Sequence, residues 1–426
     1  MNIEEYITTL IEQIRCKQAR QGVAQEIRDH ISDQTRAYEQ NGMEHEKAIE
    51  MAVREMGDPV EAGIALDRIH RPHFDWRLFL MTVLFSLAGV FLMYVTGALS
   101  QSNGQLIRQC LFTFVGIGIV VLIYFADYTF VGKYALPIYI LMSIAFLVYH
   151  RTGTKINGCI PAFRSLVYLY IPVYAGILYR YRGKGLRSII KSLLFMVVTA
   201  VLAEQLALSV FVGFSVGMIC TVLLLYAVIK GWFGANEKRT AVIVMISVFT
   251  FALAIFAVYL MFFAYDYQKM RMTAFFHQDS YQNAENFQLT LVRRVFANAQ
   301  IIGSNAEIVL DKGLVYNETF LVLAQSIAMY GMIVGIAIIT AFALFAYRAL
   351  NIVKYQKNQF GMMMSTACFL LVFFNCITGV LMNFGLWPMS TLQFPFLTRG
   401  GSGTIMYAVI IGLLMSCRRY GREQLS

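Results

Sequence analysis

Apolar residues follow two different patterns along the chain, and the pattern changes near residue 75. Before that point they recur every three or four positions, as they do on one face of an amphipathic helix. After it they form repeated runs, many of them close to the length of about 20 residues that a helix needs to cross a bilayer. The sequence therefore predicts an all-α chain with a small helical domain over 1–75 and a polytopic membrane domain over 76–420.

The N-terminal domain is predicted to contain three helices with polar outer faces. Gly57 and Pro59 mark the end of the third, because glycine favours the C-cap and proline cannot continue a helix. About 70 residues offer little core for independent stability, so this domain is expected to rely on a partner or on the membrane domain. The predicted apolar stripes are Ile3, Tyr6, Ile7, Leu10, Ile11 and Ile14; Val23, Ile27 and Ile31; and Ile49, Ala52, Val53 and Met56.

The second part is predicted to form ten membrane spans. The run from Ser192 to Ile229 is interrupted only by Glu204 and Gln205, which favours two spans joined by a tight turn; one bent helix would give nine spans. The Lys and Arg residues of alternate connections agree with ten spans and cytoplasmic termini, by the positive-inside rule. The polar N-terminus predicts no signal peptide. The spans lie near residues 78–98, 108–126, 134–149, 163–179, 189–203, 207–229, 240–264, 318–347, 360–382 and 403–417.

Composition supports the membrane assignment and argues against other classes of protein. Hydrophobic residues make up 58% of the 426 residues, charged residues only 14%, and the mean hydropathy is +0.60, which rules out a water-soluble globule. The net charge of +10 comes from Lys and Arg scattered between apolar runs, so no nucleic-acid partner is expected. The seven cysteines form no CxxC pair, and neither a disulfide framework nor a metal site is indicated.

One connection, residues 265–317, is much longer than the others and is predicted to lie on the outer side of the membrane. Its start carries Asp266, Tyr267 and Arg271. An arginine at this place can hold a phosphate or carboxylate through its planar fork of donors. Interfacial anchoring is the alternative, because tyrosine and basic residues are enriched at membrane boundaries.

More candidate site residues lie towards the end of this loop. Arg293 and Arg294 offer further donors to an anion, and Glu318 stands where the eighth span is predicted to begin. A carboxylate there can act as a general base if a hydroxyl lies within hydrogen-bond reach. Glu318 could equally be an acid in the first turn of a helix with Asn317 as its N-cap.

The last connection ends in Gly400, Gly401 and Ser402, directly before the tenth predicted span. Glycines let the backbone approach a neighbour closely, and amides at a helix start can bind an anion; small residues at span ends also serve plain helix packing. The sequence has no Walker A, HExxH, GxSxG or Rossmann motif.

Two of these strings together resemble the SEDS proteins (shape, elongation, division and sporulation; the RodA/FtsW/SpoVE family), which are ten-span membrane glycosyltransferases. In that family a DYQ…R segment ends the seventh span, as Asp266-Tyr267-Gln268 and Arg271 do here, and a P-x-P-x-x-S-x-G-G-S string precedes the tenth, matched by residues 394–402. The resemblance covers about residues 78–420. Residues 1–72 look like the helical prefix domain found ahead of some Gram-positive membrane proteins, which implies a partner rather than chemistry.

The resemblance implies a peptidoglycan glycosyltransferase that polymerises lipid II glycan strands on the outer face of the bacterial cytoplasmic membrane, in cell division, cell shape or sporulation. Its substrate would be glycan linked to undecaprenyl pyrophosphate, and its partner a class B penicillin-binding protein, a transpeptidase. A divalent cation could assist, although no ligand cluster in the sequence indicates one. Glu318 would be the catalytic base, and the substrate would be bound by Asp266, Tyr267, Arg271, Arg293, Arg294, Gly400, Gly401 and Ser402.

The chain departs from the family at the catalytic position. Family members carry an aspartate in a T-D-F/Y string at the start of span eight; here the string is Asn317-Glu318-Thr319-Phe320, and the aspartate register falls on Thr319 or, with a one-residue shift, on Glu318. One alternative is therefore a catalytically degenerate relative that scaffolds or regulates cell-wall synthesis. A second is a flippase of lipid-linked precursors, which the scarcity of charged residues in the spans disfavours.

Overall fold

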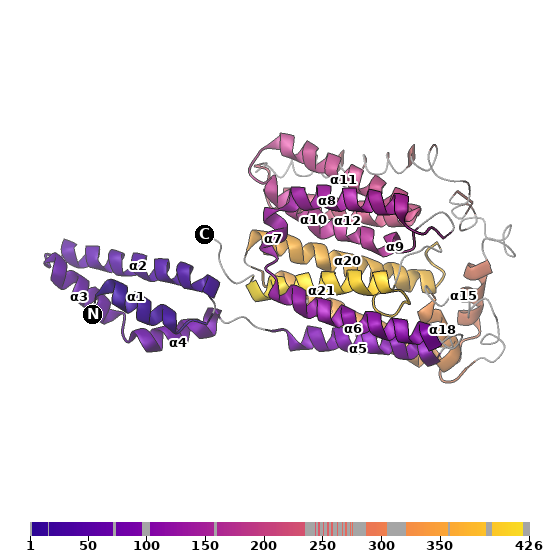
Figure 1. Ribbon diagram of the computed structural model, residues 1–426, viewed down its shortest axis with the longest axis horizontal. Coiled ribbons are helices and arrows are strands. Elements are labelled where there is room, and N and C mark those ends of the chain that lie inside the picture. The colour runs from indigo at the N-terminus through magenta and orange to yellow at the C-terminus, as the bar shows by residue number, and fades with distance from the viewer. Residues whose placement is uncertain are drawn as a thin grey trace. The chain divides into compact units, whose positions relative to one another are not determined.

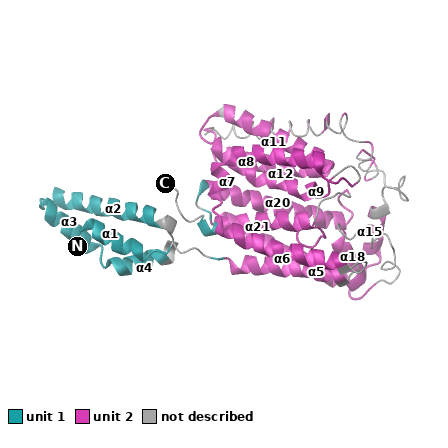
Figure 2. Cartoon of the chain, viewed as in Figure 1, with its two compact units in different colours: residues 1–74, 356–359, 418–426 teal, residues 75–355, 360–417 magenta. Residues whose placement is uncertain are grey.

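The computed structural model describes residues 2–15, 17–70, 74–95, 103–156, 160–234, 287–304, 321–356, 358–388 and 394–420, with isolated positions between 243 and 275. The chain divides into two compact units (Figure 2). Unit 1 comprises residues 1–74, 356–359 and 418–426, and unit 2 comprises residues 75–355 and 360–417. Helices are the regular elements of the described residues, which confirms the all-α prediction (Figure 1).

Unit 1 contains the four helices α1 (Ile3–Glu12), α2 (Lys17–Gln40), α3 (His45–Glu55) and α4 (Pro59–His70). The sequence predicts three, because Pro59 reads as the end of α3 and not as the beginning of another helix. Proline fits the first position of a helix, where its missing N–H has no intrahelical partner to lose. Asp58 supports this start, since its Oδ1 accepts the Val60 N–H at 2.7 Å. The predicted stripes form the core, made of Tyr6, Leu10, Ile14, Val23, Ile31, Ala52 and Val53.

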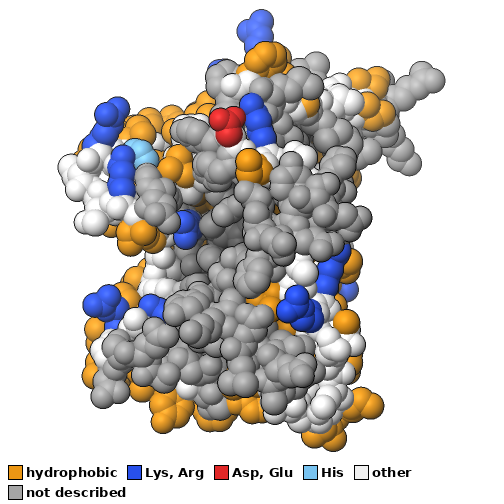
Figure 3. Space-filling view, turned by 90° about the vertical axis from the view of Figure 1, so that its right-hand side faces the viewer, with side chains coloured by type: hydrophobic (Ala, Val, Ile, Leu, Met, Phe, Trp, Pro, Cys, Tyr) orange, Lys and Arg blue, Asp and Glu red, His pale blue; other side chains and the backbone are white. Residues whose placement is uncertain are grey.

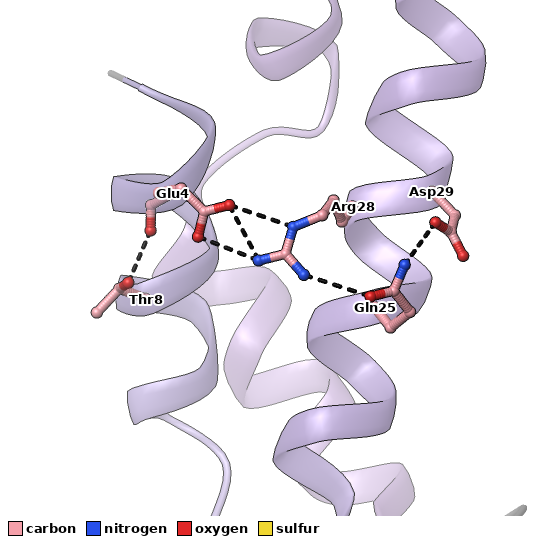
Figure 4. Close-up of polar contacts among 5 residues, drawn as sticks. All are labelled: Glu4, Thr8, Gln25, Arg28 and Asp29. Carbon is pink, nitrogen blue, oxygen red and sulfur yellow. Dashed lines mark hydrogen bonds and ion pairs between the residues drawn. The ribbon is translucent and has the colours of Figure 1, made fainter. Parts of the chain in front are cut away.

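A polar network on the surface of unit 1 links α1 to α2 (Figure 4). The Arg28 guanidinium donates to both carboxylate oxygens of Glu4, with its Nη2 3.0 Å from Oε1 and 3.1 Å from Oε2. Gln25 accepts from Arg28 Nη1 at 3.4 Å and donates to Asp29 Oδ1 at 2.8 Å. Because these side chains are exposed, the pair contributes at most about 1 kcal/mol, and its main effect is to orient the two helices.

Eight helices in the described part of the chain are long and apolar enough to cross a membrane. The fourth predicted span is formed by α9 (Phe163–Leu166), the 3₁₀ turn η1 (Val167–Leu169) and α10 (Tyr170–Arg180) in direct succession, and a short α7 (Thr129–Lys133) precedes α8. The seventh predicted span, 240–264, falls largely outside the described residues. The eight helices are α5 (Trp76–Val95), α6 (Asn103–Phe125), α8 (Ala135–Thr152), α11 (Leu186–Ala207), α12 (Val210–Ile229), α19 (Met332–Lys354), α20 (Gln359–Asn383) and α21 (Gly401–Tyr420).

The run from Ser192 to Ile229 forms two helices, as the sequence favours. Leu208 takes the left-handed conformation with φ +48° and ends α11, and Ser209 begins the next helix as the N-cap of α12. The amides of both residues bond the carbonyl oxygen of Glu204, which closes the last turn of α11. The chain therefore reverses direction within two residues, and α11 packs along α12.

The eighth predicted span, 318–347, is not one continuous helix. It contains α18 (Val322–Tyr330) and α19, separated at Gly331, where φ is +92°. A Cβ at this position would lie 2.6 Å from the carbonyl oxygen of Ile301, so only glycine fits both the conformation and the space. The amide of Met332 bonds the Gln300 carbonyl at 2.9 Å, and the segment that follows α15 (Phe287–Ala297) thus packs against the break.

The short helix α10 lies in the core of unit 2. Every residue from Tyr170 to Leu178 is buried, and α10 contacts α7, α8, α11 and α12. A helix that is apolar all round is typical of such a central position. The helices of this side of unit 2 are therefore organised around α10.

Candidate functional site

The candidate residues on α15 and before α21 lie at the end of unit 2 where α18 and α21 begin and α20 ends (Figure 1). Figure 3 views the molecule from this side and shows Lys and Arg side chains spread over the described part of this face. The helix ends here come from distant parts of the sequence, so any site at this place is assembled by the tertiary fold.

α15 packs directly on the beginning of α18. Val292 of α15 is buried together with Leu321 and Ala324, and Phe296 covers the same cluster. Leu321 is the N-cap of α18, and it is thus packed against the helix that carries two of the candidate arginines. Asn317 and Glu318 lie outside the described residues, so the alternative that they begin a helix stays a prediction.

Arg293 and Arg294 lie on the exposed side of α15, with Val292 and Val295 buried on either side of them. Gly385, just beyond the end of α20, lies beneath Arg293: a Cβ on this glycine would be 3.4 Å from Arg293 Cγ and 3.5 Å from its Nε. Both distances are those of ordinary van der Waals contact, so the arginine stem lies against the backbone there. The guanidinium is therefore held close to the end of α20.

Asn383, a residue that sequence reasoning did not single out, ties α20 to α18. Its side chain is fully buried; its Oδ1 accepts the Ala324 N–H at 3.0 Å, and its Nδ2 donates to the Gly379 carbonyl at 2.8 Å. The amides of a helix's first turn have no intrahelical acceptor, so Asn383 satisfies one of them from a neighbouring helix. In the sequence, the only indication of this role is an amide side chain at the end of an apolar run.

The start of α21 is held against α6. The Gly400 amide donates to Gln109 Oε1 at 3.3 Å, and a Cβ on Gly401 would lie 2.5 Å from the Phe112 ring. Gly400 has φ +147°, a conformation that favours glycine. These contacts agree with the close-packing alternative for Gly400 and Gly401, while Ser402 in the first turn of α21 is partly exposed.

Most of the remaining candidate site residues lie outside the described part of the chain. Asp266 is exposed, and Glu318, Thr319, Tyr267 and Arg271 lie outside the described residues, so their roles stay predictions. The described residues contain no group of three or more His, Cys, Asp or Glu side chains able to hold a metal ion. What the structure brings together is α15 with its two arginines, the end of α20 and the start of α18.

The helical fold and its apolar spans define a polytopic α-helical membrane protein. The particular family follows from a family model: the FtsW/RodA/SpoVE model, described as "Cell cycle protein", matches residues 73–423. The chain therefore belongs to the FtsW/RodA/SpoVE family, as the resemblance of segments 266–271 and 394–402 to that family predicts.

Curated relatives agree with this assignment. The chain is 24% identical over 399 residues to the "Probable peptidoglycan glycosyltransferase FtsW" of Legionella pneumophila, an alignment that covers 87% of this chain and 96% of the relative. A protein of the same description from Halomonas elongata is 26% identical over 157 residues, which cover 35% of this chain and 39% of that protein.

Solved structures share the fold at low sequence identity. A chain from the structure described as "Structural coordination of polymerization and crosslinking by a peptidoglycan synthase complex" matches with a TM-score of 0.64 and 16% identity, covering 82% of this chain and 99% of that one. The rod shape determining protein RodA of Thermus thermophilus matches with a TM-score of 0.55 and 12% identity, covering 82% of this chain and 98% of RodA.

Proposed function

We propose that this protein is a glycosyltransferase that polymerises lipid II into peptidoglycan strands on the outer face of the cytoplasmic membrane. Membership of the FtsW/RodA/SpoVE family and the described activity of the Legionella relative support the reaction class. On this proposal residues 1–75 form a cytoplasmic prefix domain, both termini are cytoplasmic, and the loop over 265–317 is outside. The role lies in division, cell shape or sporulation.

The observation that carries the proposal is the anchoring of α18 beside α15. Leu321 is buried against Val292, the neighbour of Arg293, and Asn383 holds the Ala324 amide. On this proposal the Glu318 carboxylate acts beside the arginine-bearing helix, which is the combination that transfer from a pyrophosphate requires.

In the proposed reaction a sugar hydroxyl of an incoming lipid II attacks the anomeric carbon of the glycan that is linked to undecaprenyl pyrophosphate. The new glycosidic C–O bond forms as the bond from that carbon to the pyrophosphate oxygen breaks. Glu318 accepts the hydroxyl proton as general base. Arg271, with Arg293 or Arg294, stabilises the negative charge of the departing undecaprenyl pyrophosphate through charge-assisted hydrogen bonds.

The proposed protein partner is a class B penicillin-binding protein. The support is the fold shared with a chain of a structure described as a peptidoglycan synthase complex, which coordinates polymerisation with crosslinking. A transpeptidase would crosslink the strands that this chain extends, so the two activities would act on the same side of the membrane.

The base assignment is tested with full-length protein reconstituted in liposomes with labelled lipid II. Glu318→Gln is expected to lower the initial rate of polymerisation by about 100-fold, because it removes the proton acceptor and keeps the shape of the side chain. Glu307→Gln, a neutralisation in the same loop, is the matched control and is expected to retain the rate. Equal rates for Glu318→Gln and the unaltered chain would contradict the assignment.

The second candidate is a catalytically degenerate relative, favoured by Thr319 at the family's aspartate register. It predicts no polymer from the unaltered chain, with or without a transpeptidase, and polymer from Thr319→Asp if the lost aspartate is the reason. Polymerisation by the unaltered chain would exclude this candidate, whichever residue serves as the base.

A further inference from the structure

A dense group of cations lies at the other end of unit 2 from the candidate site, where α10 and α12 end and α11 begins (Figure 1). All of these side chains are exposed. Five fall within twelve residues of sequence, and the sixth is the C-cap of α12. We call this group the basic rim: Arg180, Arg182, Lys184, Arg187, Lys191 and Lys230.

The two loops that carry the basic rim are joined to each other. The Gly183 amide donates to the Trp232 carbonyl at 2.7 Å, and the rings of Trp232 and Tyr179 meet edge to face at 5.9 Å. α10 contacts both α11 and α12, which also pack on one another. The basic rim is therefore one surface supported by the packed core of unit 2.

Aromatic rings position the cationic groups. The Arg182 guanidinium lies 4.1 Å from the centre of the Tyr179 ring, and the ammonium groups of Lys184 and Lys191 lie 5.8 and 6.0 Å from the Tyr181 ring. Such cation–π contacts hold a long side chain along apolar surface while its charged end stays at the polar boundary. The charged ends of these three side chains are thereby held beside aromatic rings, near the end of α10 and the start of α11.

The sequence places no acid near these cations along the chain. No Asp or Glu occurs between Asp127 and Glu204, nor between Glu204 and Glu237. The first turn of α11 carries no acid either, so the positive pole of that helix adds to the charge of the side chains. Positive charge is thus concentrated along this part of the chain.

We propose that the basic rim binds the anionic headgroups of bilayer phospholipids. The cations are exposed, and aromatic rings lie beside Arg182, Lys184 and Lys191. The one acid of α10, α11 and α12, Glu204, lies near the far end of α11. This end of the three helices therefore fits a phosphodiester that carries one negative charge. Each Lys or Arg near an anionic bilayer surface strengthens the attraction by a factor of about five. Orientation in the membrane needs only an excess of a few cations, and the six cations around these two joined loops exceed that requirement. This proposal does not depend on the proposed glycosyltransferase activity.

The test uses the purified full-length chain in detergent, titrated with phosphatidylglycerol or phosphatidylcholine. Retained lipids are counted by native mass spectrometry, and the midpoint of thermal unfolding is followed in parallel. The unaltered chain is expected to retain phosphatidylglycerol in preference to phosphatidylcholine. Arg182→Gln combined with Lys184→Gln and Arg187→Gln is expected to weaken phosphatidylglycerol binding at least about tenfold.

Two controls make the outcome specific. Arg36→Gln combined with Lys47→Gln and Arg54→Gln removes three exposed cations from unit 1 and is expected to leave lipid binding unchanged. Arg182→Lys combined with Arg187→Lys keeps the charge and is expected to bind as the unaltered chain does, even if the triple variant of the basic rim folds poorly. Equal binding of both lipids, or equal losses in the two triple variants, would overturn the proposal.

Discussion

Asp75 and Arg348 form an ion pair that joins the beginning of α5 to α19, with Arg348 Nη2 3.1 Å from Asp75 Oδ1. The Asp75 side chain is only 1% exposed. The same oxygen accepts the Leu78 N–H at 3.1 Å, so this carboxylate also caps the first turn of α5. One buried group therefore begins a span and connects it to a second span distant in sequence.

Removing either side of this pair should destabilise unit 2. Arg348→Gln is expected to cost about 3 kcal/mol, because it leaves the Asp75 charge buried without its partner. Asp75→Asn should cost less, since an asparagine can still cap α5. The midpoint of thermal unfolding in detergent measures both, and the double variant should cost less than the sum of the two. Strictly additive effects would show that the two side chains do not interact.

Gly89 is expected to tolerate no larger side chain. A Cβ there would lie 2.2 Å from the carbonyl oxygen of Phe396, in the segment that precedes α21. Gly89→Ala should therefore cost about 2 kcal/mol through backbone displacement. Gly118→Ala on α6 is the matched control, because nothing lies within 4 Å of its Cβ, and it should leave the thermal midpoint unchanged or raise it slightly. A neutral Gly89→Ala would contradict the close approach of α5 to this segment.

Asn383 is expected to matter both for stability and for the proposed activity. Asn383→Leu leaves the buried Ala324 amide without its acceptor, which should cost about 2 kcal/mol. It should also lower the polymerisation rate, because α18 begins three residues after the proposed site position 319. Thr378→Val on the same helix is the control, since the Thr378 hydroxyl bonds the Phe374 carbonyl of its own helix at 2.7 Å. An Asn383→Leu variant as stable and active as this control would refute the role.

The stability of unit 1 should depend on pH through Tyr6. Burial, and then the nearby Asp58 carboxylate, raise the pKa of the Tyr6 phenol above its usual value. A group whose pKa is raised on folding contributes stability below its unfolded pKa, about 10 for tyrosine, and this contribution is lost as pH rises through the folded pKa. Hydrogen exchange in α1, corrected for the intrinsic rate, should therefore report easier opening at about pH 11 than at about pH 8.

The variant Tyr6→Phe isolates this effect. It removes the titrating group and the hydrogen bond from the phenol to the Met56 carbonyl at 3.0 Å, so α1 should be about 1 kcal/mol less protected at pH 8. The alkaline loss of protection should then be smaller than in the unaltered chain. An identical alkaline loss in both proteins would assign the pH dependence to another group.

The sequence predicted much of the helical framework, because apolar runs and helical stripes are local signals. It predicted the turn between α11 and α12 from Glu204 and Gln205. It did not predict the break at Gly331, because that break depends on the Ile301 backbone packing against it. Nor did it predict that Pro59 begins a helix, since a proline marks a helix end and a helix start equally well.

Local sequence signals also predicted some residues of the candidate site, whereas contacts between distant segments were not predictable. Charged residues in a long loop pointed to Arg293 and Arg294 on α15, and Arg293 lies beside Gly385. Asn383 was missed because its importance comes from α18, a helix far away in sequence. The packing role of Gly400 and Gly401 depends in the same way on α6. Glu318 and Thr319 remain predictions from the family strings.

Whether this chain polymerises lipid II can be read from the length distribution of the glycan that it forms. Full-length protein in liposomes, alone and with a class B penicillin-binding protein, is incubated with labelled lipid II, and the products are separated on a gel. We expect a ladder of glycan strands that lengthens with time and is lost in Glu318→Gln. Unextended lipid II under both conditions, with a known polymerase active in parallel, would contradict it.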